Sequence, residues 1–135
     1  MRGFIVGHGH TQKEDETVIP EVPPRLAIEF YEGAALVSFP RRKIDGVAVR
    51  EIYELAAELT EDRSPRLLID LDGVVMVTSG VLGIFTASHK LFLHSGGQLH
   101  ISVADQKVTQ QFELMNLHLM LKLFGSRDDA LAAFK

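Results

Sequence analysis

The stretch LLIDLDGVVMVTSGVLG, residues 67–83, decides the fold of this chain of 135 residues. With Arg66 before it, the run RLLID (66–70) is short and almost continuously apolar, which is typical of a strand buried on both faces of a sheet. Asp72-Gly73 has the composition of a turn, and the apolar spacing that begins at Gly80 is helical. A buried strand followed by a loop and a helix predicts one unit of an α/β fold.

Two strands and a helix are predicted before this stretch. Residues 26–33, LAIEFYEG, alternate apolar and polar side chains, and residues 35–39, ALVSF, stop at Pro40. A Glu32-Gly33 turn between them predicts a hairpin. Asp45 is a candidate N-cap for a helix whose apolar residues recur at helical spacing. Those apolar residues are Val49, Ile52, Tyr53, Ala56 and Leu59.

Three helices and two strands are predicted from Gly80 onward. The first helix ends at Gly96-Gly97. QLHISV (98–103) alternates as a strand, Asp105 caps a second helix, and LMLKLF (119–124) is a last short strand or turn. Ser126-x-x-Asp129 has the spacing of a capping box for the final helix. The predicted buried stripe of the first of these helices is Val81, Ile84, Phe85, Ser88, Leu91 and Phe92.

This order of elements predicts an α/β fold, with a mixed sheet of four to five strands and about four helices packed against it. Residues 25–135 form the predicted domain. Residues 1–24 contain a charge cluster and three prolines, and we interpret them as an N-terminal extension or linker. Phe4-Ile5-Val6 in this extension could pair with a sheet edge or with a neighbouring copy, so a homodimer is possible.

Several large apolar residues outside the opening stretch could belong either to the core or to an exposed surface. Met115, Leu119 and Met120 could form an exposed docking patch, but core positions are the favoured interpretation. Phe85, Phe92 and Phe112 are likewise assigned to the core. The histidines of the domain lie on different predicted elements, which favours structural or surface roles; they are His89, His94, His100 and His118.

Composition excludes several classes of function. The net charge is −4 and the nearest thing to a basic stripe is Arg41-Arg42-Lys43, so nucleic acid is not an expected partner. The chain has no cysteine, and His8 and His10 in the extension lack further ligands, so neither a metal site nor a cofactor is expected. No apolar run approaches the roughly 18 residues of a membrane span. A cytoplasmic protein without membrane insertion is therefore predicted.

The motif Asp70-x-Asp72-Gly73 after an apolar strand resembles the nucleophile loop of haloacid-dehalogenase-like phosphatases. That resemblance implies Asp70 as nucleophile, Asp72 as general acid and base, and a magnesium ion held by further carboxylates. Only 63 residues follow Asp72 (135 − 72), and the acidic pair Asp128-Asp129 falls where a helix N-terminus favours carboxylates. The phosphatase is therefore a minor alternative. In the favoured interpretation, Asp72-Gly73 forms a turn and Asp70 caps the strand end.

The block DLDGVVMVTSGVLG (70–83) more closely resembles the signature of the STAS domain, the fold of anti-sigma factor antagonists. That signature runs Asp, apolar, Ser or Thr, Gly, four mostly apolar residues, then Asp-Ser-Ser-Gly-Leu-Gly. The residues that match it without a gap are Asp70, Gly73, Ser79, Leu82 and Gly83. The later segments HKLFLHSGGQLHISVA and VTQQFELMNLHLMLKLFGSRDDALAAF are also similar to the family, so the resemblance covers about residues 25–134.

The resemblance implies a non-catalytic binding module of a bacterial regulatory pathway. Family members dock onto anti-sigma factors that are serine kinases, or build multi-protein sensory assemblies, and a Ser or Thr in the loop before the second helix is the phosphorylated switch. This chain departs from the signature there: its Asp is Thr78, the usual phosphoacceptor is Gly80, and the following Gly is Val81. Ser79 and Thr78 are therefore the candidate phosphoacceptors. Ser79 is preferred because a shift of one residue would place it in the acceptor position, although either hydroxyl also suits an N-cap.

The predicted docking face comprises the loop Asp72–Gly80, the start of the second helix, and the neighbouring loop near Arg41-Arg42. Its named members are Asp72, Gly73, Thr78, Ser79, Gly80 and Val81. The expected partner is an anti-sigma factor with kinase character or another regulatory protein. The alternative is a scaffold subunit of a larger sensory or transporter assembly that works without phosphorylation.

Overall fold

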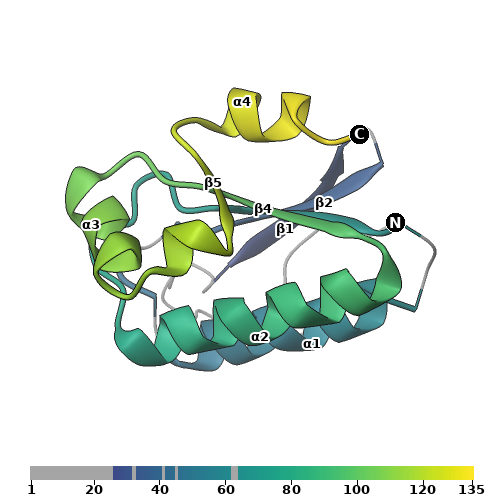
Figure 1. The fold of residues 1–135 in the computed structure, drawn as a ribbon, viewed down its shortest axis with the longest axis horizontal. Helices are drawn as coiled ribbons and strands as arrows, with labels where there is room; N and C mark the ends of the chain where they lie inside the picture. The colour runs from purple at the N-terminus through teal and green to yellow at the C-terminus, as the bar shows by residue number, and fades with distance from the viewer. Residues whose placement is uncertain (1–25, 32, 41, 45, 62–63) are drawn as a thin grey trace, which may run out of the picture.

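The computed structural model describes residues 26–31, 33–40, 42–44, 46–61 and 64–135 (Figure 1). The predicted extension 1–24, the Asp45 cap and Arg41 lie outside the described residues. The helices and strands follow the predicted order, with one short 3-10 helix, η1, in addition. They are β1 (Ala27–Tyr31), β2 (Ala34–Ser38), α1 (Gly46–Leu59), β3 (Arg66–Asp70), α2 (Ser79–Ser95), β4 (Gln98–Ser102), α3 (Gln106–Leu114), η1 (Leu117–Leu119), β5 (Lys122–Phe124) and α4 (Arg127–Ala132).

The five strands form one mixed sheet in the sequential order β1-β2-β3-β4-β5. The hairpin β1–β2 is antiparallel, and the other three pairs are parallel. Each parallel pair is joined through a helix, because parallel neighbours need a long crossover connection. The helices α1 and α2 lie side by side on one face of the sheet, and α4 covers the opposite face (Figure 1). The predicted α/β class with a mixed sheet and four α-helices is confirmed.

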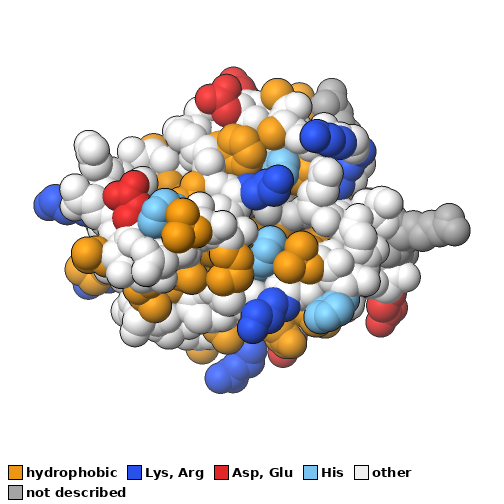
Figure 2. All heavy atoms as spheres, in the orientation of Figure 1, with side chains coloured by type: hydrophobic (Ala, Val, Ile, Leu, Met, Phe, Trp, Pro, Cys, Tyr) orange, Lys and Arg blue, Asp and Glu red, His pale blue; other side chains and the backbone are white. Residues whose placement is uncertain are grey.

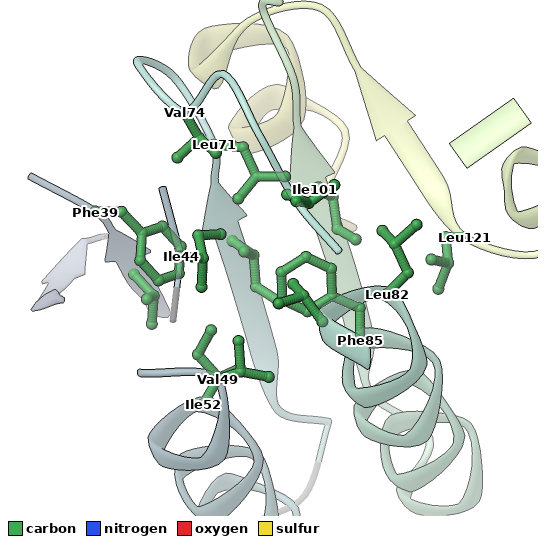
Figure 3. Packing of buried hydrophobic residues seen from close by; sticks show 14 of the residues in the cluster. Phe39, Ile44, Val49, Ile52, Leu71, Val74, Leu82, Phe85, Ile101 and Leu121 are labelled. Carbon is green, nitrogen blue, oxygen red and sulfur yellow. The ribbon is translucent and has the colours of Figure 1, made fainter. Parts of the chain in front are cut away.

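Strand β3 is the centre of the core. Its residues Leu67, Leu68 and Ile69 are completely buried. Because successive side chains of a strand point to opposite faces, Leu67 and Ile69 join the main cluster under α1 and α2, whereas Leu68 joins a smaller cluster under α4. Figure 3 shows the main cluster, with side chains of α1 and α2 directed at the sheet. The prediction of a strand buried on both faces is confirmed.

A buried histidine fastens α4 to the sheet. The Nδ1–H of His100, on β4, donates a hydrogen bond to the Ala130 carbonyl oxygen of α4 over 2.9 Å. The His100 ring also stacks on Phe134, with ring centroids 4.0 Å apart and an angle of 4° between the planes. Burial lowers the pKa of His100, and the charge of Lys122 lowers it further, so the neutral imidazole is favoured.

Two predictions about burial are partly or wholly wrong. On α2, Ile84 and Leu91 are only half-buried, while Leu82 and His89 are buried, because a helix packed against both the sheet and the neighbouring α1 buries a broad arc. The predicted core residues Met115, Leu119 and Met120 are exposed, Leu119 by 77%. The reason is local: α3 ends at Leu114, Asn116 takes the left-handed conformation (φ 59°), and the 3-10 turn that follows directs only Leu117 inward. The core assignment of Phe85, Phe92 and Phe112 is confirmed.

The Gly96-Gly97 pair ends α2, as predicted, and glycine is required at the two positions for different reasons: backbone conformation at Gly96 and lack of space at Gly97. Gly96 adopts φ 77°, a left-handed conformation that glycine takes without strain, and Gly97 N–H donates to the Phe92 carbonyl oxygen over 2.9 Å. Gly97 meets a steric limit instead. A Cβ there would lie 2.5 Å from the Pro65 carbonyl oxygen, which already accepts a hydrogen bond from Gln98 N–H.

Gly97→Ala is expected to lower the free energy of unfolding by about 2 kcal/mol, because Pro65 must move to admit the methyl group. Urea denaturation followed by circular dichroism measures the change. The matched control is Gly83→Ala, in the interior of α2, where a Cβ meets nothing within 4 Å. That variant should be more stable than the parent by about 0.5–1 kcal/mol, through helix propensity. Equal effects of the two substitutions would contradict the steric argument.

Candidate docking site

The segment between β3 and α2 is anchored by an apolar side chain at every third position. Leu71, Val74 and Val77 are buried in the main core, whereas Asp72, Met76 and the start of α2 are exposed. The loop is therefore a fixed surface that presents its polar residues to solvent. The predicted turn is present at Asp72-Gly73, where Gly73 has φ 87°.

Two contacts from other elements support this loop. Val75 N–H donates to the carbonyl oxygen of Arg42 over 2.8 Å, and Lys43 and Met76 form an isolated parallel bridge. On the other side, the Gln111 amide of α3 donates to the Val77 carbonyl oxygen over 2.9 Å. The structure thus brings Arg42 beside the loop, as the predicted docking face requires. Gln111 was not foreseen, because nothing in the local sequence connects it with a loop 34 residues earlier.

The three residues at the start of α2 have distinct roles. Thr78 is the N-cap: its backbone is extended, and its Oγ1 accepts a hydrogen bond from Val81 N–H over 3.3 Å. Ser79 is the first helical residue and is exposed, and its hydroxyl has no hydrogen-bond partner among the described residues. At Gly80, a Cβ would lie 3.8 Å from Thr78 Oγ1, an ordinary contact, so a side chain at this position would fit. The hydroxyl that is free for modification is therefore that of Ser79.

An apolar groove of about 460 Å³ opens between the N-terminal halves of α1 and α2. Thr78, Gly80 and Val81 lie along its α2 side. Among the described residues that line it, Arg50 of α1 is the one with a charged side chain. Val47 and Met76, both roughly half exposed, extend the apolar surface of α1 and the loop. The remaining lining residues are Ile44, Gly46, Val49, Tyr53 and Ile84. Exposed apolar surface of this kind is typical of sites that bind other proteins.

Asp70, at the carboxyl end of β3, has a structural role. Its Oδ1 accepts hydrogen bonds from Asp72 N–H (3.0 Å) and from the Ser102 hydroxyl (2.9 Å). Its Oδ2 accepts from Nε and Nη2 of Arg127, both at 2.9 Å. The Asp70 side chain is 3% exposed and that of Arg127 43%. A carboxylate with both oxygens engaged in this way caps the strand end, as in the favoured interpretation, and is poorly placed to attack a phosphate.

The acidic pair of the phosphatase alternative, Asp128-Asp129, has a local structural explanation. Asp128 and Asp129 lie in the first turn of α4, where Asp129 N–H donates to the Ser126 hydroxyl (3.1 Å), so the predicted cap is present. Within the described ranges, no group of three His, Asp or Glu side chains is placed to hold a metal ion. His8 and His10 lie outside those ranges. In the same part of the chain, no helix is both long and apolar enough to cross a membrane.

Solved structures with this fold include three that bear on its family. A candidate anti-sigma factor antagonist from Thermotoga maritima has a TM-score of 0.67 at 17% sequence identity, over 81% of this chain and 93% of that one. An anti-sigma-factor antagonist (STAS) domain protein from Planctomyces limnophilus has a TM-score of 0.67 at 16% identity, over 80% and 96%. An anti-sigma factor antagonist from Mycobacterium paratuberculosis has a TM-score of 0.63 at 25% identity, over 81% and 92%.

The chain therefore shares the α/β fold of these structures. The sequence model of the STAS domain matches residues 25–130. The chain belongs to the STAS domain family, as its resemblance implied. No curated protein sequence matches it.

Asp70→Asn is expected to lower the free energy of unfolding by about 2–3 kcal/mol, because it breaks the partly buried ion pair with Arg127 of α4 and perturbs the buried hydrogen bond from Ser102 of β4. Chemical denaturation measures this loss. The matched control is Asp72→Asn, which changes an exposed carboxylate and should alter stability by less than about 0.5 kcal/mol. A neutral effect of Asp70→Asn would refute the structural role of this carboxylate.

Proposed function

We propose that the protein is a non-catalytic interaction module of a bacterial regulatory pathway, acting in the cytoplasm as an anti-sigma factor antagonist. The observation that carries this proposal is the apolar groove between α1 and α2, with the anchored loop and the free Ser79 hydroxyl beside it. Its family membership and the anti-sigma factor antagonists among its structural neighbours support the same function. The partner is an anti-sigma factor with serine kinase character.

The groove supplies the attractive part of the proposed interface. Its walls are mostly apolar, and burial of apolar surface is the main driving force of protein association. Arg50 on α1 and Arg42 beside the loop add positive charge that favours an acidic partner surface. Because buried Leu71, Val74 and Val77 hold the loop, little conformational entropy is lost on binding.

Phosphorylation of Ser79 is the proposed switch. Ser79 is exposed at the first position of a helix of 17 residues, where free N–H groups and the helix dipole stabilise an added anion. A phosphate adds about −1.5 to −2 charges. Beside an apolar groove, that charge would repel an acidic partner and keep water at the interface. Thr78 is the weaker candidate, because its hydroxyl already caps α2.

A second candidate function is constitutive docking, in a sensory or transporter assembly, without phosphorylation. The observation that favours it is Gly80, which removes the hydroxyl from the position of the family's usual acceptor. The geometry permits a serine there, since a Cβ would meet only Thr78 Oγ1 at 3.8 Å. Gly80→Ser therefore separates the two candidates: phosphorylation of this variant, but not of the parent, by the captured kinase would identify a member whose switch is lost.

Ser79→Asp is expected to reduce capture of the cognate anti-sigma factor at least tenfold, because it places a fixed negative charge at the proposed interface. Ser79→Ala should retain capture and abolish the phosphopeptide. The matched control is Gln106→Asp, since Gln106 is likewise the first residue of a capped helix, α3, and is exposed outside the docking face. The measurement is the affinity of each purified variant for the partner captured from the native cells, with mass spectrometry of the loop. Equal affinities of the parent and Ser79→Asp would contradict the proposed interface.

A further inference from the structure

A second cavity, separate from the docking groove, lies at the edge of the sheet. Its volume is about 380 Å³, and it is bounded by the C-terminal half of α2, by β4 and β5, and by the segment after α4. His89 lies ten residues after Ser79, about 15 Å farther along α2, and no residue lines both cavities. The position follows from the sheet register: β5 begins at Lys122, opposite His100, so it leaves the first two residues of β4 without a neighbour on that side.

The cavity combines apolar walls with basic and imidazole groups. The apolar walls include Phe92, Leu99 and Phe124, and the basic and imidazole groups are His89, His100, Lys122 and Lys135. No Asp or Glu side chain is among the described residues that line it. Figure 2 looks onto this region, where His and Lys or Arg side chains lie beside hydrophobic ones between the strands and α2, with no acidic side chain among them.

The two histidines are buried, and no Asp or Glu side chain lies among the described residues that line the cavity with them. His89 is 8% exposed and His100 is 2% exposed. Burial lowers the pKa of each, and the charge of Lys122 lowers both further. One ammonium group thus acts on both rings. Among the described residues Lys122 has no carboxylate partner.

His89 also has an unused hydrogen-bonding atom. Its Nδ1 is buried and has no hydrogen-bond partner among the described residues. The ring of His100, by contrast, is fixed by its Nδ1–H donation to Ala130. Buried polar atoms are nearly always paired in folded proteins, so an unpaired one in a residue that lines a cavity is unusual. No hydrogen bond at Nδ1 fixes the tautomer of His89, so its imidazole can carry the proton on the nitrogen that donates an N–H to a ligand in the cavity.

We propose that this cavity binds a small carboxylate with a compact apolar body, held by the Lys122 ammonium and the His89 imidazole. The apolar body lies against Phe92, Leu99 and Phe124. A cavity of about 380 Å³ is in the range of roughly 300–1,000 Å³ that is usual for small-molecule sites. A carboxylate fits better than a phosphate, because the described residues that line this cavity include no arginine and no helix N-terminus to supply the several donors that phosphate groups use. This site is independent of the proposed function.

The test is a titration of the full chain, carrying ¹³C- and ¹⁵N-labelled histidine, with sodium benzoate at neutral pH. Benzoate should shift the imidazole resonances of His89 and His100 in a saturable way, and leave those of exposed His94 and His118 unchanged. Lys122→Gln should weaken binding about tenfold, because one charge-assisted contact is lost. The matched control is Lys90→Gln, an exposed lysine of α2 that does not line the cavity, which should bind like the parent.

Two further ligands make the result decisive. Benzyl alcohol keeps the apolar ring and removes the charge, and inorganic phosphate keeps a charge and removes the ring; both should bind at least tenfold more weakly than benzoate. Equal binding of either ligand would overturn the proposed class. No saturable shift with benzoate or octanoate at millimolar concentration would overturn the site itself. The exposed position of Lys122 means that Lys122→Gln remains folded, which its imidazole spectrum verifies directly.

Discussion

The carboxylate of Asp70 is the interaction on which the arrangement of this domain depends. It lies at the end of the central strand, and its hydrogen bonds join three parts of the fold: the turn after β3, the end of β4 and the start of α4. Desolvation of a carboxylate is costly, and the two hydrogen bonds that Arg127 donates to Oδ2 offset that cost. The same group thus fixes where the docking loop leaves the sheet and where the last helix is placed.

After Asp70, the docking loop buries an apolar side chain at every third position. Each buried side chain of the segment after Asp70 holds the backbone in place, and each exposed position between them is available to a partner. The N-cap at Thr78 then sets the first turn of α2, so that the residue after the cap is the one that offers a free hydroxyl. The difference between Thr78 and Ser79 is therefore one of hydrogen bonding, although both residues carry the same functional group.

The sequence predicted those features whose signals are local. Hydrophobic periodicity predicted the order of elements and the burial of β3 on both faces. Residues within one helical turn of each other predicted the caps at Asp105 and Ser126 and the turn at Asp72-Gly73. Contacts between distant residues were not predictable in this way. The partner of Asp70 lies 57 residues away, and the groove and the basic cavity exist only once separate elements pack together. The exposure of Leu119 was mispredicted because a single left-handed residue, Asn116, redirects an apolar segment that has core composition.

The distance in sequence between Asp70 and Arg127 has a consequence for the order in which the domain forms during synthesis. At about 5–20 residues per second, Arg127 follows Asp70 out of the ribosome by roughly 3–11 s. During that interval the central strand ends in a carboxylate without its cation, and the apolar surface of Leu36 and Leu68 has no helix over it. Because α2 emerges before α4, the face of the sheet that holds Leu36 and Leu68 is the later of the two faces to receive its helix.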